Sequence, residues 1–138
     1  MYNINIETKE TLTNALLAYY QTLSDGDLTT LAALMTKGSY ITLLTALGFK
    51  RSFKDPEFRE LLKTSSNSDA ALSIVEAVLS DDLKQEKQQH RIELLSFEPK
   101  GRDRITVNYQ EDGHLKKVYF AKHNEQWHID YNAGRKTA

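Results

Sequence analysis

The chain has 138 residues, of which 40% are hydrophobic and 27% charged, with no cysteine and a formal net charge of −1. This size and composition predict one soluble domain. Dispersed basic residues do not favour nucleic-acid binding, and no apolar run approaches the roughly 20 residues that span a bilayer. We therefore expect a cytoplasmic protein without a disulfide, a thiolate metal site, a nucleic-acid partner or a membrane partner.

Residues 8–24 are predicted to form an amphipathic helix with Thr8 as its N-cap. The apolar residues that recur at helical spacing are Leu12, Ala15, Leu16, Tyr19 and Leu23. Asp25-Gly26 is expected to end this helix, and Asp27 to cap a second one. The apolar stripe of the second helix comprises Leu28, Leu31, Ala32, Leu34 and Met35. A tight corner therefore joins the two helices.

The middle of the chain is predicted to be mainly helical. Residues 39–50 are mostly apolar or threonine and fit either a buried helix or a strand, of which we favour the helix. Asp55-Pro56 predicts a helix start because proline suits the first helical turn, and this helix is expected to end near Lys63. After a polar loop at residues 64–68, Asp69 is expected to cap a last helix whose apolar residues extend to Leu83 and which runs into the charged segment 84–89.

Residues 90–131 are predicted to form a four-stranded antiparallel meander. Asp112-Gly113 is a strong signal for a two-residue hairpin, because both positions of such a turn need positive φ. Further turns are expected at Asn124-Glu125 and in a four-residue loop at residues 99–102. The pairs expected across the three turns are Leu94–Val107, Ile92–Tyr109, Val107–Val118, Ile105–Phe120, Phe120–Ile129, Lys122–Trp127 and Val118–Tyr131.

These pairings place most apolar side chains of the meander on one face. A slip of one residue would reverse the faces, so the agreement of three turns favours the assignment. The residues expected to face the helices are Ile92, Leu94, Ile105, Val107, Val118, Phe120, Trp127 and Ile129. We therefore predict an α+β domain spanning residues 1–138, in which N-terminal helices pack on a curved antiparallel sheet in a cone-like roll. Residues 132–138 are expected to be a frayed tail.

Two segments carry a resemblance to a known family. Residues 19–28, Tyr-Tyr-Gln-Thr-Leu-Ser-Asp-Gly-Asp-Leu, resemble the first helical corner of the nuclear transport factor 2-like superfamily, which includes ketosteroid isomerase and the SnoaL-like polyketide cyclases. Residues 126–131, Gln-Trp-His-Ile-Asp-Tyr, look like its last strand. The resemblance implies a cone-shaped sheet that wraps a long helix and leaves a pocket at its open end. Residues 39–89 depart from the family, which usually has a short strand pair after the second helix, so the chain resembles a divergent member.

Tyr19 stands where ketosteroid isomerases carry a tyrosine that donates a hydrogen bond to the developing oxyanion. Their general base is an aspartate beyond the second helix, and the same interval here reaches Leu43, with no carboxylate between Gly38 and Arg51. Proton abstraction needs such a base. We therefore favour a small-ligand-binding or protein-interaction module over the alternative, a cofactor-free isomerase, cyclase or hydratase that uses Tyr19.

The expected ligand is small and either apolar or anionic, and it would lie in a pocket between helix and sheet. The candidate ligand-binding residues are Tyr19, Tyr20, Tyr40, Tyr109, Lys122, Trp127 and Tyr131. The aromatic residues fit two roles, since they either line a pocket or fill the core. Lys122 would attract an anion or extend across Trp127 to water.

The outer face of the sheet is expected to form a homodimer interface, unless the middle helices fold over it. The candidate interface residues are Leu95, Phe97, Thr106, Tyr119, Ala121 and His128. His123 and His128 are expected to lie diagonally across a hairpin, with His90 and His114 elsewhere. Because zinc needs three or four converging ligands, we expect no metal site and no other cofactor.

Overall fold

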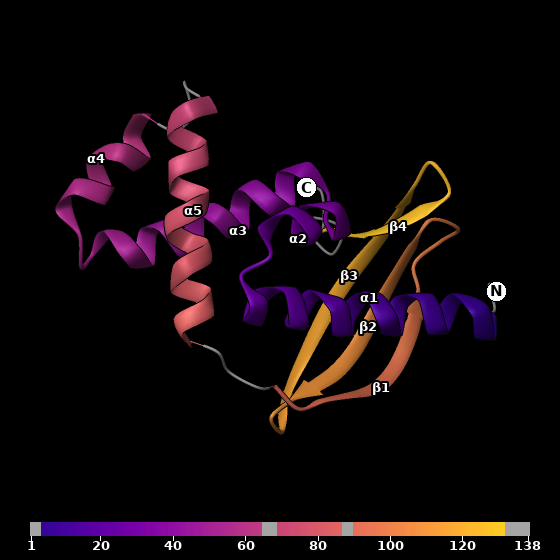
Figure 1. Ribbon diagram of the computed structural model, residues 1–138. Coiled ribbons are helices and arrows are strands. Elements are labelled where there is room, and N and C mark those ends of the chain that lie inside the picture. Colours follow the sequence, from indigo (N-terminus) through magenta and orange to yellow (C-terminus); the bar gives the residue numbers. More distant parts are fainter. Residues whose placement is uncertain (1–3, 65–68, 87–89, 132–138) are drawn as a thin grey trace, which may run out of the picture.

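In the residues that the computed structural model describes (4–64, 69–86 and 90–131), five helices precede a four-stranded antiparallel sheet (Figure 1). The helices are α1 (Ile6–Asp25), α2 (Leu28–Leu34), α3 (Lys37–Ser52), α4 (Pro56–Thr64) and α5 (Asp69–Glu86). The strands are β1 (Ile92–Pro99), β2 (Arg104–Glu111), β3 (His114–His123) and β4 (Gln126–Ile129), in the order β1-β2-β3-β4. The predicted α+β class is confirmed. Most of the predicted polar loop (65–68) and the predicted tail (132–138) lie outside the described residues.

Within the described ranges, none of the helices combines the length and the apolar character that crossing a membrane requires.

The first two helices begin and end at residues with defined capping chemistry. The expected N-cap of α1, Thr8, is wrong, because Asn5 lies earlier and its Oδ1 accepts a hydrogen bond from the Thr8 backbone N–H at 2.7 Å. Gly26 ends α1 with φ of 67°, as the sequence predicts. Asp27 then caps α2 by accepting from the Thr30 backbone N–H at 3.2 Å.

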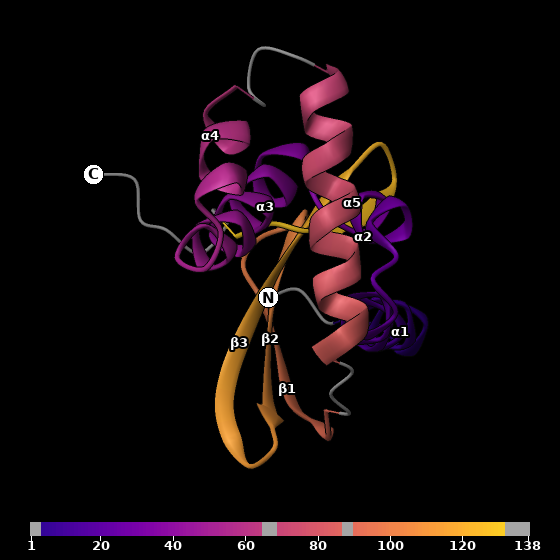
Figure 2. The same cartoon turned by 60° about the vertical axis from the view of Figure 1, so that its left-hand side comes forward.

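The middle segment is helical, and the helix favoured for residues 39–50 is confirmed as part of α3. Figures 1 and 2 show α3, α4 and α5 grouped beyond one end of the sheet rather than over its outer face. The start of α4 after Asp55 is also as predicted, since Asp55 Oδ1 accepts from the Phe58 backbone N–H at 3.1 Å.

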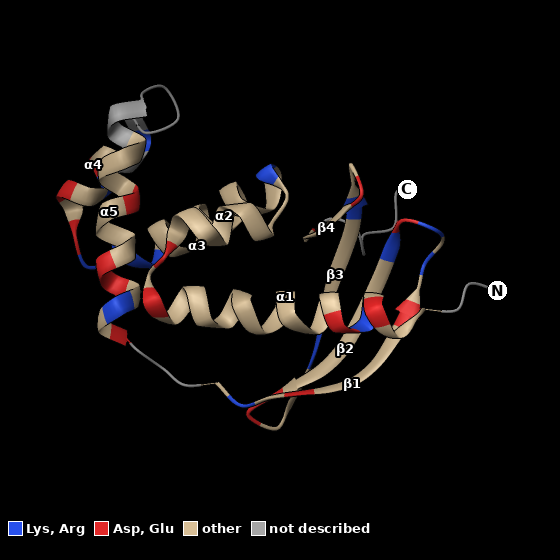
Figure 3. Cartoon of the chain, turned by 45° about the vertical axis from the view of Figure 1, so that its right-hand side comes forward, with Lys and Arg blue, Asp and Glu red and all other residues tan. Residues whose placement is uncertain are grey.

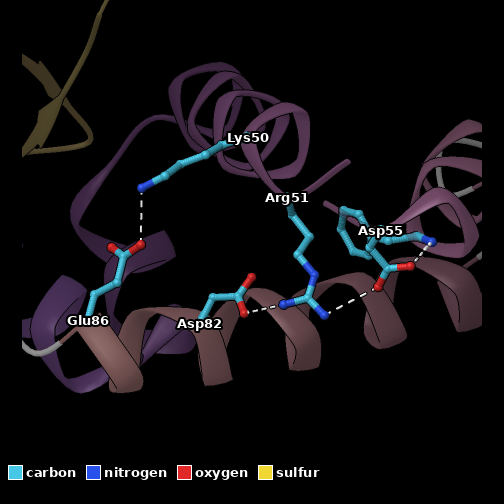
Figure 4. A network of polar contacts seen from close by, with 6 residues as sticks. Lys50, Arg51, Asp55, Asp82 and Glu86 are labelled. Carbon is cyan, nitrogen blue, oxygen red and sulfur yellow. Dashed lines mark hydrogen bonds and ion pairs between the residues drawn. The ribbon is translucent and has the colours of Figure 1, made fainter. Parts of the chain in front are cut away.

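Ion pairs join α3 to α5 (Figure 4). Arg51 donates to Asp82 at 2.6 Å and also reaches Asp55 at 3.3 Å, while Lys50 pairs with Glu86 at 3.0 Å. The side chains of Arg51 and Asp82 are about one third exposed, at 32% and 28%, whereas those of Lys50 and Glu86 are largely exposed. The Arg51–Asp82 contact is therefore the less screened of the two links between these helices.

Two of the three predicted turns have the expected geometry. Asp112 and Gly113 have φ of 51° and 85°, and Asn124 and Glu125 have φ of 52° and 64°. Both central residues of each hairpin thus adopt the positive φ of a primed turn. The predicted pairs that these two turns set and that the register contains are Val107–Val118, Ile105–Phe120, Phe120–Ile129 and Lys122–Trp127. The predicted pair Val118–Tyr131 is wrong, because β4 ends at Ile129 and the Tyr131 backbone N–H donates to Ser39 Oγ at 2.9 Å.

The predicted register of the first hairpin is also wrong. Leu94 pairs with Tyr109 instead of Val107, and Ile92 pairs with Glu111 instead of Tyr109. The register then shifts between Leu94 and Ser96, which leaves Leu95 as the extra residue of a β-bulge. After the bulge Phe97 pairs with Val107, so its side chain lies on the inner face rather than the outer one.

The hydrophobic core lies between α1 and the inner face of the sheet and continues among the other four helices. Leu12 and Leu16 of α1 are fully buried, as are Val107 and Phe120 of the sheet. All eight strand residues expected to face the helices belong to this core or pack against it. Figure 3 shows why α1 fits this place: between Glu10 and Asp25 it carries no charged residue.

The start of α3 is fastened to the end of β4. The Thr36 backbone N–H donates to the Ile129 carbonyl at 2.9 Å, and Met35 forms an isolated parallel bridge with Ile129. Ser39 is fully buried and its Oγ accepts from both Thr36 Oγ1 and the Tyr131 backbone N–H. These bonds fix the position of α2 and α3 against the last strand.

The corner at Gly26 generates a prediction about stability. Gly26 combines positive φ with close packing, since an added Cβ would lie 2.5 Å from the Ser80 carbonyl of α5. We expect Gly26→Ala to lower the free energy of unfolding by about 2–4 kcal/mol, from left-handed strain and overpacking together. Urea unfolding followed by circular dichroism measures this loss.

Two glycines provide matched controls for Gly26→Ala. Gly101 has φ of 93° but open space around it, so Gly101→Ala should cost only the strain, about 1–2 kcal/mol. Gly38 lies in α3 without a close neighbour, so Gly38→Ala should be neutral or stabilise by up to about 1 kcal/mol. Equal losses for Gly26→Ala and Gly101→Ala would contradict the close contact with α5.

Candidate functional site

The seven residues predicted to bind a ligand fall in three places. Tyr19, Tyr20, Tyr109 and Tyr131 form one cluster between α1 and the sheet, which we call the tyrosine cluster. Tyr40 joins α3 to α5. Lys122 and Trp127 lie together beside the first turn of α1. The prediction therefore brought together residues of more than one site.

The tyrosine cluster is held by two hydroxyl pairs. Tyr19 Oη lies 2.9 Å from Tyr131 Oη, and Tyr20 Oη lies 2.7 Å from Tyr109 Oη. The rings of Tyr19 and Tyr20 meet edge to face, with centroids 5.3 Å apart. Because each hydroxyl is engaged by another hydroxyl, the four side chains act as the polar margin of the core.

Burial raises the pKa of each of these four phenols above its ordinary value. The hydroxyl contact with Tyr131 raises the pKa of Tyr19 further, and that with Tyr109 raises the pKa of Tyr20 further. The tyrosines are therefore neutral hydrogen-bonding groups at physiological pH. A neutral phenol is able to donate to an oxyanion, but the Tyr19 hydroxyl already has Tyr131 as its partner.

Tyr40 has a structural contact of its own. Its hydroxyl donates to Glu76 Oε2 of α5 at 2.5 Å, and burial raises the pKa of Tyr40. Leu43, at the position where the family resemblance expects a general base, lies on α3 and packs against the core. Neither residue supplies a base to Tyr19.

Lys122 and Trp127 line a hollow of about 170 Å³ between the first turn of α1 and the sheet. Lys122 Nζ lies 5.8 Å from the centroid of the Trp127 ring, which is within the range of a cation–π contact. Its carboxylate neighbour, Glu125 at 3.4 Å, is 92% exposed, so water screens this ion pair. The Lys122 side chain itself is only 32% exposed.

The hollow is built from three segments that are distant in sequence. Its other lining residues are Ile4, Asn5, Thr8, Pro99, Gly101, Arg102 and Ile105. Figure 3 shows Lys and Arg at the ends of β2 and β3 nearest the N-terminus of α1. Sequence reasoning missed Arg102, although the meander itself places the loop after β1 and the turn before β4 at the same end of the sheet.

The outer face presents less apolar surface than the sequence predicts. Phe97 was wrongly assigned to it, because the bulge turns that side chain toward the core. Thr106 and Ala121 are buried within the chain, with register partners Tyr119 and His128 beside them. Leu95, at the bulge, remains 47% exposed. The homodimer stays a prediction.

Comparison with known proteins adds no relative. The sequence matches no protein-family model, and no curated protein or solved structure is similar to it at a significant level.

The tyrosine cluster predicts how stability changes in alkaline solution. A raised pKa means that the folded protein holds these protons more tightly than the unfolded chain, where the pKa is about 10. Stability from this source is fully present below pH 10 and is lost as the pH rises toward the folded-state pKa. We expect the free energy of unfolding to fall above pH 10, and to fall less steeply in the double variant Tyr20→Phe/Tyr109→Phe.

Urea unfolding at a series of pH values from neutral to alkaline measures this dependence. Tyr119→Phe is the matched control. Tyr119 lies on the outer face, so this variant loses a hydroxyl outside the tyrosine cluster. Superimposable pH profiles of wild type and the double variant would show that the cluster does not bind its protons as described.

Proposed function

We propose that this protein is a ligand-binding domain, a divergent member of the nuclear transport factor 2-like superfamily, and that it takes a small anion in the hollow beside Lys122. The observation that carries the proposal is the pairing of Lys122 with Trp127 in that hollow, with Arg102 also in its lining. Two cations and an aromatic ring offer charge attraction and an apolar wall to the same ligand. The order of helices followed by a meander supports the superfamily assignment.

The size of the hollow limits the ligand. Pockets for drug-sized molecules usually measure about 300–1,000 Å³, whereas this one measures about 170 Å³. The space suits a carboxylate or phosphate group with a few further atoms. It equally suits the ionised end of a longer molecule that continues into solvent.

Binding has more support than catalysis. In a cofactor-free isomerase, cyclase or hydratase, Tyr19 would need a free hydroxyl and a general base within reach. Its hydroxyl instead pairs with Tyr131, and the position expected to hold the base is Leu43. The hollow that contains Lys122 lies at the other end of α1, beside Thr8.

Trp127 makes the proposal directly testable, because it is the only tryptophan in the chain. Titration with inorganic phosphate, acetate, citrate and phenylacetate should change its fluorescence saturably for at least one of these anions. Lys122→Met should weaken that binding about tenfold or more, since the charge that attracts the anion is removed.

Lys117→Met is the matched control. Lys117 lies on the same strand, is exposed, and pairs with Asn108 away from the hollow, so the variant loses the same charge from another place. It should bind the anion as wild type does. Equal weakening in both variants would show that Lys122 acts only through the net charge of the protein. The absence of a saturable response to all four anions would refute the proposal.

A further inference from the structure

A second group of polar side chains gathers at the other end of the sheet, near the Asp112-Gly113 turn. His90 precedes β1, while Glu111 ends β2 and Asp112 follows it. Their potential ligand atoms all lie within 4.8 Å of one another. We call these three residues the His90 cluster, and it shares no residue with the hollow beside Lys122.

The imidazole of His90 points at two carboxylates without forming a hydrogen bond to either. His90 Nδ1 lies 2.9 Å from Glu111 Oε2 and 3.7 Å from Asp112 Oδ2. The Nδ1 atom is buried and has no hydrogen-bond partner among the described residues. A buried nitrogen that makes no hydrogen bond is costly, and a cation bound to Nδ1 would remove that cost.

Each carboxylate is held by one oxygen and has the other directed at His90. Glu111 Oε1 is bound by Lys116, and Asp112 Oδ1 accepts the Arg91 backbone N–H at 2.9 Å. The remaining oxygens, Oε2 and Oδ2, are the ones nearest His90 Nδ1. Such outer contacts orient the ligands of protein metal sites. The Tyr20 ring packs on the His90 imidazole, with the two ring centroids 5.1 Å apart.

We propose that His90, Glu111 and Asp112 form a site for a divalent cation of the zinc class. Ligand atoms that each lie about 2.1 Å from one ion are roughly 3–4 Å from each other. The distances from His90 Nδ1 to the two carboxylate oxygens, 2.9 and 3.7 Å, are close to this range. One imidazole with two carboxylates suits zinc and its transition-metal neighbours. Two carboxylates against the single ammonium of Lys116 leave net negative charge for the cation, and Asp112, half exposed, leaves the site open to solvent.

Three protein ligands leave a coordination position for water or another molecule, as in sites that are not purely structural.

The proposal is tested with the full chain, free of any affinity tag and of metal. Co²⁺ is titrated and followed by its absorption, and Zn²⁺ is then added as a competitor. Saturable one-to-one binding is expected. His90→Gln should raise the dissociation constant roughly tenfold or more.

Asp112→Asn is a second variant that preserves the turn, because asparagine favours the positive φ of this position and its Oδ1 still accepts from Arg91. It removes a charged ligand and should also weaken Co²⁺ binding about tenfold. His114→Gln, at an exposed position of the same hairpin, should bind as wild type does.

His128→Gln tests a competing site within the described residues, where the rings of His123 and His128 approach with centroids 6.3 Å apart. Loss of binding in His128→Gln with retention in His90→Gln would overturn the proposal. Failure of the wild type to bind either Co²⁺ or Zn²⁺ saturably would overturn it as well.

Discussion

The packing of α1 on the inner face of the sheet is the contact on which the rest of the structure depends. Four residues at its centre, Leu12, Leu16, Val107 and Phe120, are fully shielded from water, and each buried side chain of this size contributes about 1.5–3 kcal/mol. The tyrosine cluster closes the same interface with hydroxyl pairs, so the polar groups at its margin are satisfied within the chain. Because the contact is occupied along the middle of α1, the hollow with Lys122 and Trp127 lies at the end of this helix.

The sequence predicts the local geometry of this fold better than its irregularities. Asp112-Gly113 and Asn124-Glu125 require a particular backbone conformation, and the pairings counted outward from them are correct. The first hairpin has a longer loop, and no residue type marks the bulge at Leu95, so counting from its loop gave the wrong partners. A bulge depends on how the strand fits its neighbour and on the twist of the sheet, which are properties of the assembled structure.

The candidate sites divide in the same way. Alternation along the strands correctly places Tyr109 and Trp127 on the inner face, but whether an aromatic side chain lines a space or fills it depends on the residue opposite, such as Tyr20 for Tyr109. The strand pairing predicted from the sequence contains a sign of the His90 cluster that the spacing of the histidines does not reveal. Extending the predicted pair Ile92–Tyr109 by two residues sets His90 opposite Glu111, and the real register also brings the two together.

The bulge at Leu95 also changes what the sheet offers at its border. β1 is an edge strand, and a straight edge presents unpaired backbone groups on which a strand of another molecule can add. The bulge interrupts that row, Glu93 and Glu98 carry charge on either side of it, and Pro99 lacks a backbone N–H. On the opposite border, β4 is only four residues long and the Ile129 carbonyl is taken by Thr36. Both borders are thus protected within one chain, which disfavours intermolecular strand addition and the aggregation that follows from it.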